Sequence, residues 1–124
     1  MAILNEPAVL GDALKWEQSN DYSRRKVTIA SGQDLALLQV VGKITASGKF
    51  AILNPAAADG TENAAGFLMA AVDASAADRE GVIIERDALV AMDNLVWPAG
   101  ITAPQKAAAI AELEALGIKA VVLA

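Results

Sequence analysis

The chain has 124 residues, which is typical of one domain, and 55% of them are hydrophobic although only 4% are aromatic. Its net charge is −5, all of it beyond residue 26, and an acidic body argues against nucleic-acid binding, where a basic stripe is expected. The absence of cysteine and histidine excludes disulfides, thiolate metal sites and most nucleophile–base pairs. Because no apolar run reaches the roughly 18 residues of a membrane span, and no basic segment precedes an apolar one at the N-terminus, we expect neither a membrane partner nor a signal peptide.

The first 22 residues have little hydrophobic pattern, and Pro7 and Gly11 interrupt any helix. We interpret them as an arm outside the core. A disordered terminus and a segment that orders on a partner are both possible readings. Trp16 and Tyr22 favour the second reading, since partner interfaces are enriched in aromatic residues.

The chain then becomes basic and β-branched. Ser23–Lys26 leads into a short predicted strand over residues 27–29. The three basic residues could form a small anion site, but a solvated strand start is the favoured interpretation. A turn is predicted at residues 31–34.

A hairpin is predicted next. Residues 35–44 form a strand region in which Gly42 marks a bulge or a close backbone approach. Residues 45–48 form the turn, and residues 49–53 return as a strand. Residues 54–58 are read as a loop.

The stretch from residue 59 to 73 is expected to be the centre of the fold. Asp59 can bond its own backbone two residues on, and Gly60 tolerates positive φ. The following run, residues 67–72, is apolar on both faces of a strand, so both faces should be covered, as in a sandwich, a closed barrel or a subunit interface. A helix is the rival reading, and Gly66 with the preceding turn favours a strand. One face of this strand would carry Phe67, Met69 and Ala71, and the other Leu68, Ala70 and Val72.

The next segments are a polar connection over residues 74–81 and a strand over residues 82–85, which residues 88–90 could continue. Asp93 is a plausible cap for a short turn containing residues 95–97.

One helix is expected near the C-terminus. Thr102 and Gln105 form a predicted capping box at its start, and Gly117 is the expected left-handed stop. A final strand over residues 118–123 follows. The expected buried stripe of the helix contains Ala109, Ile110, Leu113 and Leu116, whereas Glu112 and Glu114 are expected to face away.

The possible catalytic groups are pairs of carboxylates. Each pair lies beside Gly, Ala or Ser in an expected turn, where Asp is common for backbone reasons. Neither a calcium loop nor a phosphate-binding glycine motif is complete. We therefore predict no enzyme, no catalytic residue, no cofactor and no metal. The pairs considered are Asp59/Glu62, Asp73/Asp78 and Asp87/Asp93.

Several short pieces carry a family resemblance in their order and spacing. The more specific ones are an Asp-Gly-Thr turn followed by Gly-x-Leu, and a Leu-x-Trp-Pro piece. The pieces are Ser23-Arg24, Val27–Ile29, Val41–Ile44, Gly48–Phe50, Asp59–Thr61, Ala65-Gly66, Leu68, Arg86–Ala88, Leu95–Pro98, Gln105 and Leu116–Ile118. Together they resemble the lambda-type bacteriophage head decoration protein family, capsid-stabilising protein D.

The resemblance implies a mainly β (α+β) fold: a small β-clip-like body with one C-terminal helix and an extended N-terminal arm. It implies a virion protein, made in the host cytoplasm, that forms homotrimers on the outer surface of the expanded capsid. The trimers would occupy three-fold and quasi-three-fold positions and stabilise the shell against packaged DNA. In the family the arm is mobile in solution and orders on the major capsid protein. By this analogy residues 1–26 are the capsid-binding arm and residues 27–124 the decoration domain.

Two sets of site residues follow as expectations. The capsid-binding arm residues are Leu10, Leu14, Trp16, Tyr22, Arg24 and Arg25. The residues expected to pack in the trimer or the core are Phe67, Leu68, Met69, Val72, Leu95, Trp97 and Pro98. Two alternatives stay open: a small β-clip hydrolase that uses Asp pairs with magnesium on nucleotides, and a surface adhesion or carbohydrate-binding module, against which the sparse aromatic residues argue.

Overall fold

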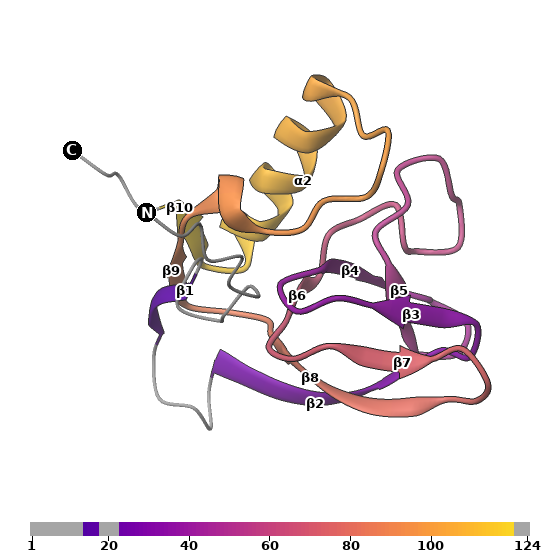
Figure 1. The fold of residues 1–124 in the computed structure, drawn as a ribbon. Coiled ribbons are helices and arrows are strands. Elements are labelled where there is room, and N and C mark those ends of the chain that lie inside the picture. Colours follow the sequence, from indigo (N-terminus) through magenta and orange to yellow (C-terminus); the bar gives the residue numbers. More distant parts are fainter. Residues whose placement is uncertain (1–13, 18–22, 121–124) are drawn as a thin grey trace, which may run out of the picture.

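The computed structural model describes residues 14–17 and 23–120. In this part of the chain, five strands close into a barrel in the order β2-β5-β4-β6-β8, and α2 packs beside it (Figure 1). A three-stranded sheet, β1-β9-β10, lies on the side of the barrel that α2 also approaches, and β3 and β7 form a two-stranded sheet. The predicted mainly β class with a C-terminal helix is confirmed. The elements are β1 Leu14–Glu17, β2 Arg24–Ile29, β3 Gln33–Leu35, β4 Val40–Lys43, β5 Phe50–Ile52, β6 Gly66–Leu68, β7 Val72–Ala74, β8 Arg79–Ile84, β9 Ala88–Val90, the 3₁₀ helix η2 Met92–Asn94, α2 Ala103–Ala115 and β10 Ile118–Ala120.

Two hydrophobic cores meet at the barrel wall. The barrel core contains Leu68 and Ile83, and the helix core contains Phe67 and Ile84 together with Leu113 of α2. Successive residues of a strand point to opposite faces. In β6 and in β8, one of two adjacent residues therefore packs in the barrel core and the other in the helix core. Phe67 and Leu68 are both fully buried. The prediction that both faces of the run over residues 67–72 are covered is confirmed for Phe67 and Leu68. It was wrong for Ala70 and Ala71.

The prediction of one continuous strand from residue 67 to 72 was wrong. The chain leaves the barrel after Leu68 and re-forms a strand at Val72, now paired with β3 in another sheet. Ala70 and Ala71, between the two strands, are exposed. Their methyl groups bury too little apolar surface to keep the chain in one sheet, so the larger Leu68 and Val72 determine where each strand lies. The helical alternative was wrong as well.

A second expected strand is also divided. Residues 35–44 contain the end of β3, a turn at Leu37 and Leu38, and then β4. Leu38 has a φ of 70° and is 1% exposed, so its burial in the helix core offsets an unfavourable backbone conformation. The hairpin between β4 and β5 is confirmed, as is the turn at residues 45–48.

The C-terminal helix follows its capping signals closely. Thr102 is the N-cap, its hydroxyl accepts from the Gln105 N–H at 3.3 Å, and the Gln105 side chain accepts from the Thr102 N–H at 3.0 Å. Gly117 has a φ of 85° just past the helix, as predicted. β10 follows and pairs in parallel with β9 over residues 118–120, and the rest of the predicted final strand lies outside the described residues.

Three details of the expected helix region were wrong. Leu116 is 39% exposed, because the chain turns into Gly117 there. Glu112 is half-buried and accepts from the Ala64 N–H at 3.1 Å, so it fixes a loop against the helix. Asp93 does not cap its turn: the N-cap of η2 is Ala91, and Asp93 instead pairs with Lys106.

Candidate functional site

The N-terminal strand β1 is built into the body of the protein. It pairs antiparallel with β9, with Leu14 opposite Val90 and Glu17 opposite Ala88, and an irregular register between Leu14 and Trp16. The Leu14 side chain packs against the helix core. β1 therefore extends the sheet that β9 and β10 form beside α2 (Figure 1).

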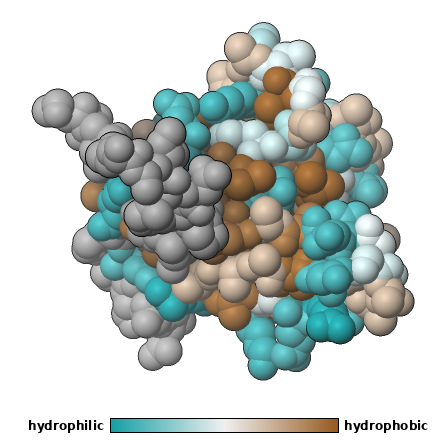
Figure 2. All heavy atoms as spheres, viewed as in Figure 1, coloured by the Kyte–Doolittle hydropathy of each residue, from teal (hydrophilic) through white to brown (hydrophobic). Residues whose placement is uncertain are grey.

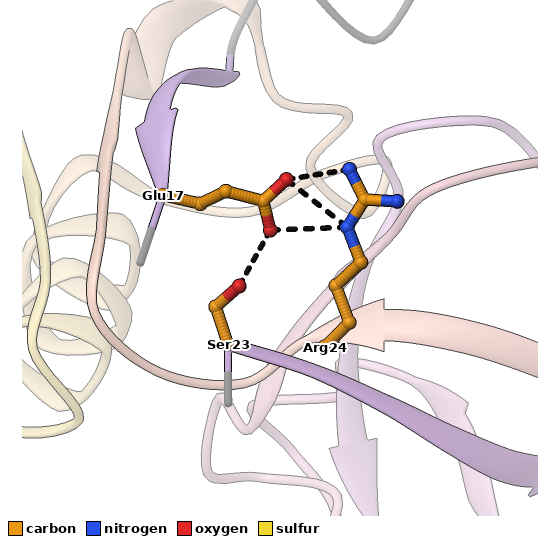
Figure 3. Close-up of polar contacts among 3 residues, drawn as sticks. All are labelled: Glu17, Ser23 and Arg24. Atoms are coloured by element: carbon orange, nitrogen blue, oxygen red, sulfur yellow. Dashed lines mark hydrogen bonds and ion pairs between the residues drawn. The ribbon is translucent and has the colours of Figure 1, made fainter. Parts of the chain in front are cut away.

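The end of β1 is held by three polar side chains, Glu17, Ser23 and Arg24, which we name the β1 clamp (Figure 3). The Ser23 hydroxyl donates to Glu17 Oε2 at 2.5 Å. Arg24 Nε lies 3.0 Å from both carboxylate oxygens, and Arg24 Nη2 lies 2.5 Å from Oε1. Such two-point pairing of a guanidinium with a carboxylate is geometrically specific and stronger than a bond between neutral groups.

The clamp is partly shielded from water. Ser23 is fully buried, and the Glu17 and Arg24 side chains are 13% and 30% exposed. The hydrogen bonds from Arg24 hold the pKa of Glu17 below its ordinary value, an effect that the Ser23 hydroxyl reinforces and burial partly opposes. The same bonding to Glu17 raises the pKa of Arg24. Both groups are therefore charged at neutral pH, and the pair connects β1 to the start of β2.

The three consecutive cations of β2 each face an acidic side chain. Besides Arg24, Arg25 Nη1 lies 3.5 Å from Glu85 Oε2, and Lys26 Nζ lies 3.1 Å from Glu80 Oε2. The Lys26–Glu80 pair is open to solvent and contributes little to stability. In the Arg25–Glu85 pair the Arg25 side chain is 51% exposed, whereas the Glu85 side chain is only 13% exposed. The carboxylate partners argue against an anion site. The interpretation as a solvated strand start fits the exposed Arg25 and Lys26, but it was wrong for Ser23, which is fully buried.

The predicted arm residues are therefore found in different environments. Leu14 packs on the helix core, Arg24 belongs to the β1 clamp, and Arg25 extends along β2 toward Glu85. Leu10 and Tyr22 lie outside the described residues, as does the side chain of Trp16. Their role in capsid binding stays a prediction.

The sequence reasoning did not identify Glu17 and Ser23. Two signals were present: alternation over Leu14–Glu17, and an acidic residue seven positions before Arg24. Neither is specific, because the contact depends on β1 docking against β9.

The expected packing residues fall into two groups. Phe67, Leu68, Val72 and Leu95 are buried within the single chain. Met69, Trp97 and Pro98 are partly exposed. Apolar side chains gather in the middle of the face seen in Figure 2, below α2. Whether any of these residues meets another subunit stays a prediction.

Trp97 is fixed from two sides. Its indole Nε1 donates to the Met92 carbonyl oxygen at 3.0 Å, and Lys106 Nζ lies 5.5 Å from its ring centroid. Lys106 also pairs with Asp93 at 3.2 Å. The preceding Val96 forms a parallel bridge with Gln39. The Leu-x-Trp-Pro piece thus joins η2, α2 and the start of β4.

The Asp59-Gly60-Thr61 piece is a turn that supports the hairpin. Asp59 Oδ1 accepts from the Thr61 N–H at 3.0 Å and from its hydroxyl at 2.6 Å, and these bonds lower the pKa of Asp59. The Asp59 carbonyl accepts from the Thr45 N–H at 2.8 Å. The predicted bond from Asp59 to its own backbone is confirmed, as is the positive φ of Gly60, which is 110°.

Two further acidic candidates also accept hydrogen bonds, Asp73 within its own turn and Asp78 from residues distant in the sequence. The Ser75 hydroxyl and N–H lower the pKa of Asp73. Lys49, with help from the Ser31 N–H, lowers the pKa of Asp78. In residues 14–17 and 23–120, no group of three or more acidic side chains could hold a metal ion. Likewise, no helix among these residues is long and apolar enough to cross a bilayer.

These observations define a small β-barrel protein whose polar side chains are engaged in holding strands and turns together. The family model for the bacteriophage lambda head decoration protein D matches residues 3–118, and the chain belongs to this family. It is accordingly a structural protein of the phage virion with a role in capsid decoration. A search of curated proteins found no match.

Proposed function

We propose that this protein is a homotrimer that binds the major capsid protein on the outer surface of the expanded phage head. It would occupy three-fold and quasi-three-fold positions and stabilise the shell against the pressure of packaged DNA. The observation that carries the proposal is the family match over residues 3–118, which spans the body and nearly all of the predicted arm. The protein would be made in the host cytoplasm and act only on the virion.

The energetics of an arm favour a trimer. An extended arm that adds to a sheet edge gains about 0.5–1.5 kcal/mol for each backbone hydrogen bond, but ordering it costs about 1–2 kcal/mol per residue. One arm alone is therefore marginal. Three arms on one rigid trimer act at a high effective concentration, which raises overall affinity by about 10²–10⁴-fold.

The residues proposed for the capsid contact come from the family resemblance, and those for the subunit contact also from their exposure in the structure. Leu10, Trp16, Tyr22 and Arg25 are proposed to meet the capsid. Met69, Trp97 and Pro98 are proposed to meet the neighbouring subunit, since they retain exposed surface while Phe67 and Leu68 do not. Burial of such partly exposed apolar groups is typical of subunit contacts.

The test uses expanded shells assembled without this protein. Purified protein is added, and the shells are imaged and heated. We expect added mass at three-fold positions on the outside, three chains of 12.8 kDa at each of these positions, and a higher temperature of shell rupture. Shells that stay bare, or that are decorated without gaining heat resistance, would contradict binding and stabilisation respectively.

A further inference from the structure

The β1 clamp divides the predicted arm of residues 1–26 at an unexpected place. Leu14–Glu17 is a strand of the β9 sheet, and Arg24 begins a strand of the barrel. Residues 1–13 precede this anchored strand. They connect to β1 at Leu14, whose side chain lies against the helix core.

We infer that the β1 clamp is a positioning device: Glu17, held by Ser23 and Arg24, anchors β1 on β9 and so fixes where and in which direction residues 1–13 are presented to the capsid. This inference rests on the proposed function. Glu17, Ser23 and Arg24 act through β1 and are positioning residues. The capsid contacts themselves belong to other parts of the chain.

The geometry favours anchoring over release. β1 is held at both ends, by Leu14 against the helix core and by the two-point Glu17–Arg24 pair. Between these ends its register with β9 is irregular, but Leu14, Trp16 and Glu17 each have a partner in β9. Ser23, which completes the clamp, is fully buried and its carbonyl also accepts from the Glu85 N–H at 2.9 Å. A strand that detaches easily from its sheet would have fewer and more exposed contacts.

An anchored strand also lowers the cost of binding. Residues that are already ordered lose no further conformational freedom on the capsid. An anchored β1 therefore strengthens the capsid binding of the segment attached to it. In a trimer, three anchored β1 strands would also set the spacing of the three arms. Multivalent binding requires a spacing that lets all arms bind at the same time.

The first test is Glu17→Gln, which removes the charge and keeps the shape. Glu80→Gln is the matched control. Glu80 forms an ion pair with Lys26, which lies in β2 as Arg24 does, but both side chains of this pair are about 70% exposed. We expect faster backbone hydrogen exchange over residues 14–17 and about tenfold weaker shell binding for Glu17→Gln alone. Unchanged or tighter shell binding by Glu17→Gln would overturn the inference.

The second test replaces the clamp by a covalent link. Glu17 and Ala88 are directly opposite in an antiparallel pair, where Cα atoms are about 4.5–5.5 Å apart, a separation that a disulfide can span. The chain has no other cysteine, so Glu17→Cys with Ala88→Cys offers a single intrachain disulfide. We expect the oxidised double variant to bind shells as the unmodified protein does, and the reduced form to bind about tenfold more weakly.

The outcomes are separable. If the oxidised form fails to bind while the reduced form binds, β1 must leave β9 on the capsid and anchoring is wrong. If both forms bind equally, the clamp has no positioning role. If even the unmodified protein leaves shells bare, the proposed function itself fails, and the inference fails with it. Circular dichroism of both redox forms shows whether each is folded.

Discussion

Gly42 of β4 lies directly against the backbone of Thr61, so that a Cβ atom built on Gly42 would fall 2.6 Å from the Thr61 Cα and 2.8 Å from the Thr61 carbonyl oxygen. Thr61 belongs to the Asp-Gly-Thr turn, and its buried side chain is held by Asp59. The turn can therefore pack flat on the hairpin only because position 42 has no side chain. This confirms the close backbone approach predicted at Gly42.

Gly42→Ala should destabilise the protein because backbone atoms must shift to admit the methyl group. Overpacking of this kind costs about 1–3 kcal/mol, or more where backbone must move. The free energy of unfolding from urea denaturation, at one fixed protomer concentration, measures the loss. Gly32→Ala is the control: its φ of 89° is unfavourable for alanine, but no atom lies within 4 Å of the added methyl group. A Gly42→Ala protein as stable as the unmodified one would show that the turn can move away freely.

Leu113 and Leu116 provide a second comparison. Leu113 is fully buried in the helix core, whereas Leu116 is 39% exposed. Leu113→Ala should lower the free energy of unfolding by about 2–5 kcal/mol through lost burial and a residual cavity. Leu116→Ala should change it by no more than about 1 kcal/mol. Equal losses, measured by urea denaturation, would mean that Leu116 is buried in the assembled protein, for example by another subunit.

Local signals in the sequence predicted the local parts of the fold. The capping box of Thr102 and Gln105, the stop at Gly117 and the Asp59 turn each involve residues a few positions apart, so their hydrogen bonds could be anticipated from spacing alone. The two-faced burial of Phe67 and Leu68 also followed from composition, because only a strand between two cores can be apolar on both sides.

Long-range pairing determined what could not be predicted. The run after Leu68 divides because Val72 pairs with Leu35 in a different sheet, and nothing within the run indicates that partner. The β1 clamp depends on β1 docking against β9, more than 70 positions along the chain. An ion pair between Glu17 and Arg24 becomes specific only after that docking has brought the two side chains together.

The pH dependence of β1 follows from the lowered pKa of Glu17. A carboxyl whose pKa is lower in the folded state contributes stability above its unfolded value, and this contribution is lost as the pH falls through the folded value. Backbone hydrogen-exchange protection of residues 14–17 should therefore be complete above the ordinary pKa of 4.5 and decrease below it. Because Asp59, Asp73 and Asp78 also have lowered pKa values, the comparison with Glu17→Gln isolates this group. Equal pH profiles for the two proteins would contradict the assignment.

Two truncations separate the arm from its anchor. Removing residues 1–13 retains β1 and its clamp, whereas removing residues 1–22 also deletes Leu14 and Glu17 and uncovers the edge of β9. The longer truncation should be less stable than the shorter one by about 1–3 kcal/mol, because it loses partly buried apolar surface and several hydrogen bonds. An uncovered strand edge should also make it prone to associate, which light scattering detects. Both truncated proteins should fail to decorate shells if residues 1–13 make the proposed capsid contact. If the protein that lacks only residues 1–13 decorates shells with the affinity of the full chain, the capsid contact lies elsewhere on the protein.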